Sequence, residues 1–162
     1  MSMNACLAAI DVRALKQLKA DPDSVVAFIE AIDDPPPHEL YLHKMWHAIH
    51  YMLTGTAWSA AGPLGQAILG GEEVGPNLGY GPARILTPDK VRATSQALAG
   101  LSVAEFRGRF DPSQMETAGI YPNIWMRERD TILEELTAHF ENLTSFYRST
   151  ASRGDGALLW MQ

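Results

Sequence analysis

The segment that most constrains the fold of this chain is residues 40–55, which read LYLHKMWHAIHYMLTG. At about 100° per residue its apolar side chains form one helical stripe. That stripe comprises Leu42, Met45, Trp46, Ile49, Met52 and Leu53. A second stripe beside it carries His43, His47, His50 and Thr54. Gly55 is suited to end the helix in a left-handed conformation. The pattern predicts a core-facing helix with polar, partly titratable groups along one flank.

Length and charge narrow the class of protein. The chain has 162 residues, which is enough for one domain with a single core. Apolar residues make up 46% and charged residues 20%, the proportions of an ordinary soluble globular protein. The net charge of −6 argues against generic binding to nucleic acid or to an anionic membrane. An acidic surface of this kind would suit a basic protein partner.

Cysteine usage and the first residues indicate a cytoplasmic protein. Cys6 is the single cysteine, so no internal disulfide can form, as expected in a reducing compartment. Residues 1–10 lack a basic region and are followed at once by Asp11, which makes them a poor signal peptide. No apolar run approaches the roughly 20 residues that span a bilayer. We therefore expect a cytoplasmic protein without a membrane segment.

The remaining pattern predicts a helix-dominated α+β fold, with residues 1–162 as a single domain. Helices are expected from Val12 and over 25–32, 63–69, 88–99, 103–109, 112–118 and 128–152. Residues 33–37, with three prolines, are expected to be a stiff connector, and the glycines and prolines of 72–84 predict a loop. Residues 3–10 fit a buried strand or a helical lead-in, and 83–86 and 157–161 fit strands. The two chain ends, joined by residues 83–86, would then form a small sheet.

Several short motifs, in order along the chain, resemble those of the YfbM-like family, a set of uncharacterised bacterial proteins. They are WxxxHxxLTG over residues 46–55, AILG over 67–70, GYGPAR over 79–84, the pair Tyr121-Pro122 and a Phe-Tyr pair in the last helix. The resemblance covers nearly the whole chain and implies a single compact α+β domain of the YfbM-like type. The matching positions are Trp46, His50, Thr54, Gly55, Tyr80, Arg84 and Tyr121. Because the family has no established activity, it implies no substrate, cofactor or catalytic residue.

The histidines and glycines could belong to a metal or phosphate site, but neither pattern is specific. His43 and His47 lie one helical turn apart, yet His-x-x-x-His without the adjoining glutamate of a metalloprotease is a weak zinc signal. No Gly-Lys-Ser/Thr follows the glycines of residues 75–81, so a phosphate-binding loop is not indicated. No serine or cysteine has the surroundings of a known nucleophile. We therefore expect no metal, no cofactor and no catalytic residue.

His50 and Arg84 are the two polar residues with the clearest expected environment. His50 lies beside the apolar stripe, so we expect it to be mostly buried, with one ring nitrogen bonded to a neighbour and a lowered pKa. Arg84 follows a Gly-Pro turn next to an expected strand. Its guanidinium suits a carboxylate of the protein or of a ligand, and we favour an internal salt bridge.

Two functional hypotheses remain open. The first is a non-catalytic protein-binding module, of which an antitoxin-like or immunity-like protein is one version. The second is a small-molecule enzyme or sensor with a pocket near His50, Tyr80 and Arg84. The candidate binding residues are Trp46, His50, Tyr80, Arg84 and Tyr121.

Overall fold

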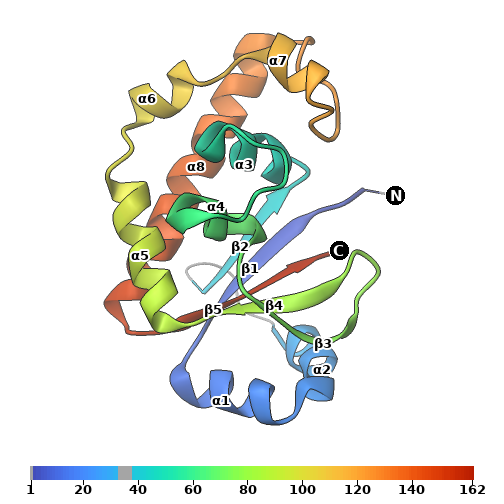
Figure 1. Ribbon diagram of the computed structural model, residues 1–162, viewed down its shortest axis with the longest axis vertical. Helices are drawn as coiled ribbons and strands as arrows, with labels where there is room; N and C mark the ends of the chain where they lie inside the picture. The colour runs from blue at the N-terminus through green and yellow to red at the C-terminus, as the bar shows by residue number, and fades with distance from the viewer. Residues whose placement is uncertain (1, 33–37) are drawn as a thin grey trace.

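The computed structural model describes residues 2–32 and 38–162, which form one α+β domain in three layers (Figure 1). The middle layer is a five-stranded antiparallel sheet with the strand order β2-β1-β5-β4-β3. Its strands are β1 (Ala5–Ile10), β2 (Glu39–His43), β3 (Glu72–Asn77), β4 (Pro82–Leu86) and β5 (Gly156–Met161). The predicted helix-dominated α+β fold is confirmed. The expected connector over residues 33–37 lies outside the described residues.

Helices cover both faces of the sheet (Figure 1). One face carries α1 (Val12–Ala20) and α2 (Val25–Glu30), joined by a short 3-10 turn, η1 (Pro22–Ser24). The other face carries α3 (Trp46–Thr54), α4 (Gly62–Leu69), α5 (Pro88–Ala99), α6 (Val103–Gly108), α7 (Pro112–Thr117) and α8 (Arg129–Ser152). The predicted positions of α4 to α8 agree with this structure to within a few residues.

The two ends of the chain pair at the centre of the sheet. β1 and β5 run antiparallel from the pair Ala5–Met161 to the pair Ile10–Gly156. Leu7 and Leu159 face the core under α3 to α8, whereas Trp160 faces the core under α1 and α2. A strand that is buried on both faces reads as a continuous apolar run, which is why periodicity alone could not classify residues 3–10. The predicted pairing of the chain ends is confirmed.

The expected helix over residues 40–54 is wrong in its first part, because β2 occupies residues 39–43. Leu42 in β2 is buried while its neighbours Tyr41 and His43 are exposed, which is the alternation of a strand. His43 then takes a left-handed backbone conformation, with φ of 48°, and α3 begins only at Trp46. His43 therefore does not belong to the row of helical histidines.

The expected loop over residues 72–84 is also corrected, because β3 occupies Glu72–Asn77. The register slips between Val74 and Asn77, and Gly75 at this bulge has φ of 79°. A Cβ atom on Gly75 would lie 2.7 Å from the Pro22 carbonyl oxygen, so η1 could not approach a larger residue. Pro76 is tolerated because β3 is an edge strand. The expected strand at residues 83–86 is confirmed as β4.

We predict that a chain lacking residues 157–162 does not fold. The deletion removes β5, the central strand, and exposes the hydrogen-bonding edges of β1 and β4 together with both cores. Circular dichroism should show no cooperative thermal transition for this variant, whereas Gln162→Ala should melt as the full chain does. An unchanged melting temperature after the deletion would refute the role given to the end pairing.

Candidate functional site

His47, in the first turn of α3, joins three separate segments of the chain. Its Nδ1 accepts a hydrogen bond from the Tyr121 backbone N–H at 3.0 Å, so the ring proton lies on Nε2. Nε2 in turn donates to the Ala57 carbonyl oxygen at 2.9 Å. Burial lowers the pKa of His47, and the Ala57 carbonyl offsets part of that lowering. The neutral His47 side chain thus links α3 to two loops, with one hydrogen bond to each.

Trp46 and Tyr121, two of the sequence candidates, lie together beside His47. The Trp46 ring stacks on His47 with centroids 4.6 Å apart, and its centroid lies 6.4 Å from that of Tyr121. Trp46 Nε1 donates to the Met3 carbonyl oxygen at 3.1 Å. The Met3 backbone N–H donates to the Tyr121 hydroxyl at 3.0 Å. Both rings are therefore tied to the residue that leads into β1.

Trp58 is the exposed member of this cluster, and the sequence reading did not place it among the candidates. Its side chain is 64% exposed, and its ring centroid lies 4.4 Å from that of His47 and 6.0 Å from that of Trp46. It belongs to residues 55–61, here called the Trp58 loop, which join α3 to α4. The one sequence signal was a tryptophan among small residues just after a helix that ends in glycine.

Side-chain hydrogen bonds hold the Trp58 loop against the end of α3. The Thr56 N–H donates to the Thr54 hydroxyl at 3.1 Å, and the Ser59 N–H donates to the Thr56 hydroxyl at 3.2 Å. At the far end of the loop, Gln66 Nε2 donates to the Ala60 carbonyl oxygen at 2.6 Å. With the bond from His47 to Ala57, the loop is anchored along most of its length.

His50 lies one turn further along α3 and is completely buried. Burial lowers its pKa to about 4, with smaller contributions from the neighbouring His47, when that ring is protonated, and from Arg84. The nearby Ser59 backbone opposes part of this lowering. Neither ring nitrogen has a hydrogen-bond partner among the described residues. The expected burial and lowered pKa are confirmed, and the expected hydrogen bond is wrong.

Arg84 binds the end of a helix instead of forming the expected salt bridge. Its Nη2 donates to the Ile68 carbonyl oxygen at 3.1 Å, and the Tyr147 hydroxyl donates to the adjacent Ala67 carbonyl oxygen at 2.6 Å. Both side chains therefore stabilise the C-terminal end of α4. Burial lowers the pKa of Arg84, an effect that the charge of Glu73 on β3 opposes. Within residues 2–32 and 38–162, no carboxylate lies within 4.0 Å of the Arg84 guanidinium.

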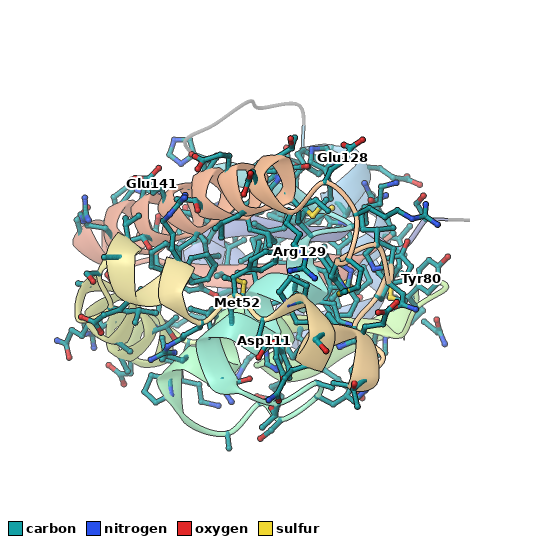
Figure 2. The ribbon with its side chains drawn as sticks, turned by 90° about the horizontal axis from the view of Figure 1, so that it is seen from above. Met52, Tyr80, Asp111, Glu128, Arg129 and Glu141 are labelled. Carbon is teal, nitrogen blue, oxygen red and sulfur yellow. The ribbon has the colours of Figure 1, made fainter. Side chains whose placement is uncertain are left out.

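Tyr80 lies apart from the other candidates, in the turn between β3 and β4. It is 39% exposed, and it projects at the margin of the molecule, away from Met52 of α3 (Figure 2). No hydrogen bond or ring contact joins it to His50 or Arg84 in the part of the chain that the structure describes. The structure thus groups Trp46 with Tyr121 and places His50 near Arg84, while Tyr80 stands alone.

Two further features of the described residues bear on function. No group of three or more histidine, cysteine, aspartate or glutamate side chains is placed to hold a metal ion in these segments. Among the described helices, none combines the length and the apolar character needed to cross a membrane.

We predict that His50→Leu does not lower the free energy of unfolding at pH 7 and raises it by up to about 1 kcal/mol. The reason is that an apolar side chain leaves no buried nitrogen without a hydrogen-bond partner. The variant should also lose less stability in acid. His50 has a pKa of about 4 when folded and about 6.5 when unfolded, so its protonation does not contribute to stability above pH 6.5. Between pH 6.5 and 4 the unfolded chain gains the proton first, which favours unfolding.

Urea denaturation at pH 7 and at pH 5 measures both effects. The exposed His38→Ala serves as the matched control and should keep the full loss of stability in acid. An equal acid-induced loss in His50→Leu and in the natural protein would contradict the role assigned to His50.

Comparison with known proteins adds the family. The profile described as "Domain of unknown function (DUF1877)" matches residues 1–160. A similar solved structure is the crystal structure of a protein of unknown function, YfbM from Escherichia coli, with a TM-score of 0.78, 23% identity and coverage of 100% of both chains. At this identity the similarity concerns the fold, and no curated protein matches. Because the matched range spans nearly all of its residues, this chain belongs to the DUF1877 family.

Proposed function

We propose that this protein is a non-catalytic binding domain that recognises another protein through the Trp58 loop. The observation that carries the proposal is a tryptophan that is 64% exposed while its ring packs against the buried His47. Tryptophan is among the residues most enriched at the energetic centres of protein interfaces.

The way in which the loop is held supports this proposal. A side chain that must be immobilised on binding costs about 0.5–1.5 kcal/mol in lost entropy. Trp58 already packs against His47, and the loop backbone is fixed through Ala57 and through Thr56. The tryptophan would therefore bury its exposed face in a partner with little further ordering.

Charge suggests the chemistry of the partner. A net charge of −6 attracts a basic protein and raises the rate of encounter at low salt. An antitoxin-like or immunity-like role is one form that such binding could take. A cytoplasmic location, expected from the single and buried Cys6, is part of the same proposal.

The candidate residues take different parts in this proposal. Trp46 packs against both Trp58 and Tyr121 and so supports the loop. Tyr80 is an exposed ring in a separate turn and takes no part in this surface. We assign structural roles to His50 and Arg84. The alternative, a small-molecule pocket at His50, Tyr80 and Arg84, has less support, because the Arg84 guanidinium already binds the Ile68 carbonyl and Tyr80 lies apart.

Trp58→Ala should weaken binding strongly and leave the fold intact. The partner can be captured by cross-linking tagged protein in cells of the encoding organism, identified by mass spectrometry and then purified for calorimetry. We expect the affinity to fall at least about 30-fold, which corresponds to about 2 kcal/mol for a central interface residue. The melting temperature should fall by only several degrees, because the two lost ring contacts are each worth about 0.5–1.5 kcal/mol.

Val26→Ala is the matched control, since Val26 is an exposed apolar residue on α2, under the opposite face of the sheet. It should bind as the natural protein does. A purified partner that binds Trp58→Ala with unchanged affinity would refute the proposal.

A further inference from the structure

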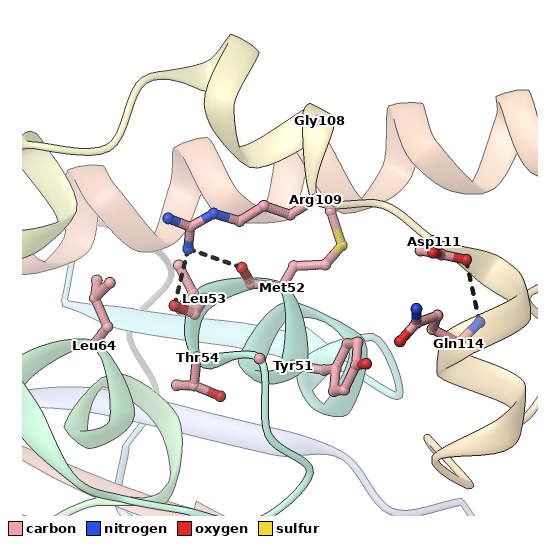
Figure 3. A pocket seen from close by; sticks show the side chains of 10 residues that line it. Tyr51, Met52, Leu53, Thr54, Leu64, Gly108, Arg109, Asp111 and Gln114 are labelled. Carbon is pink, nitrogen blue, oxygen red and sulfur yellow. Dashed lines mark hydrogen bonds between the residues drawn. The ribbon is translucent and has the colours of Figure 1, made fainter.

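A cleft of about 620 Å³ lies between the C-terminal end of α3 and the segment that joins α6 to α7 (Figure 3). Tyr51 and Thr54 line it from α3, and Arg109, Asp111 and Gln114 line it from the other side. The volume falls within the range of about 300–1,000 Å³ that small-molecule sites occupy. Trp58 is not among the lining residues, so this cleft is separate from the surface proposed above for a protein partner.

Arg109 presents a fixed cationic group to the cleft. Its Nη1 donates to the Met52 carbonyl oxygen at 3.1 Å and to the Leu53 carbonyl oxygen at 3.0 Å, at the end of α3. These two bonds hold the plane of the guanidinium (Figure 3). Nε and Nη2 have no hydrogen-bond partner within the described residues. That free edge carries two parallel N–H donors, the geometry that matches a carboxylate.

Asp111 presents the opposite charge to the same cleft. Its Oδ1 accepts from the Gln114 backbone N–H at 3.2 Å, at the start of α7, which leaves Oδ2 as a free acceptor. No ion pair within 4.0 Å joins Asp111 to Arg109 in the described chain. Figure 3 shows the side chain of Tyr51 between the two charges, whereas Met52 is buried in the core beneath it. The cleft therefore holds a positive and a negative group, with an apolar surface between them.

We infer that this cleft binds a small zwitterion. The ligand carboxylate lies on the Nε and Nη2 edge of Arg109, and the ligand ammonium group lies on Oδ2 of Asp111. A simple anion would be attracted by Arg109 and repelled by Asp111, and a simple amine would meet the reverse. A molecule that carries both charges satisfies both residues, and its carbon chain covers the half-buried Tyr51. Amino acids are the most common compounds of this class.

Titration with unbranched ω-amino acids from β-alanine to 6-aminohexanoate tests the inference. The readout is the backbone amide spectrum of nitrogen-15-labelled protein, in particular the signals of Gly55, Gly108 and Gln114 at the cleft. We expect saturable shifts of these signals with at least one zwitterion. The carboxylate and the amine of matched chain length should each give none. No saturable shift with any zwitterion, or equal shifts with the matched carboxylate, would overturn the inference.

Two variants test the two charges separately. Arg109→Lys keeps the positive charge but lacks the two-donor edge, and Asp111→Asn keeps an oxygen for α7 but removes the negative charge. Each should weaken zwitterion binding about tenfold or more, which is about 1.4 kcal/mol. Arg107→Lys is the control, because Arg107 pairs with Glu134 on α8 and does not line the cleft.

The amide spectrum of each variant also reports whether the fold is retained. If Arg109→Lys loses its native spectrum, Asp111→Asn still decides the outcome. Unchanged affinity in Asp111→Asn would overturn the inference, whatever the result for Arg109→Lys.

Discussion

The antiparallel pairing of β1 with β5 is the contact on which the rest of this structure depends. It brings the two chain ends to the centre of the sheet and so fixes Met3, just before β1, against the helical layer. Met3 binds the Trp46 indole and the Tyr121 hydroxyl. These two rings lie beside His47, which holds the Trp58 loop through Ala57. Backbone pairing in the sheet is in this way connected, contact by contact, to the most exposed tryptophan of the surface.

Much of the fold could be predicted from the sequence, because its central parts carry strong patterns. The apolar run over residues 157–161 predicts a strand, and the long periodic segment that forms α8 predicts a helix. The edge strands could not be predicted. In β2, Leu42 fits a strand and also fits the helical stripe of α3, so only packing on β1 decides between them. In β3, Gly75 and Pro76 indicate a loop, and they are accommodated by a bulge at the sheet edge.

Of the properties of the candidate site, the sequence predicted only those that depend on burial alone, such as the pKa of a buried histidine. The lowered pKa of His50 follows from its place on α3, whereas the partners of its ring nitrogens depend on how the neighbouring loop folds. Arg84 binds the Ile68 carbonyl, 16 residues away. The sequence predicts that a helix ends near residue 69, but no local pattern indicates that the Arg84 side chain reaches it. The exposure of Trp58 is likewise a property of the folded loop, since a tryptophan in that position could equally pack inside.

The central claim is that the Trp58 ring is held rigid at the surface by His47. Nitrogen-15 relaxation of the tryptophan indole N–H groups tests it most directly, with the buried Trp46 and Trp125 as rigid references in the same spectrum. The account predicts an order parameter of about 0.85 for the Trp58 indole, close to that of the references. A value below about 0.6 would mean that the ring moves freely in solution, and would contradict it.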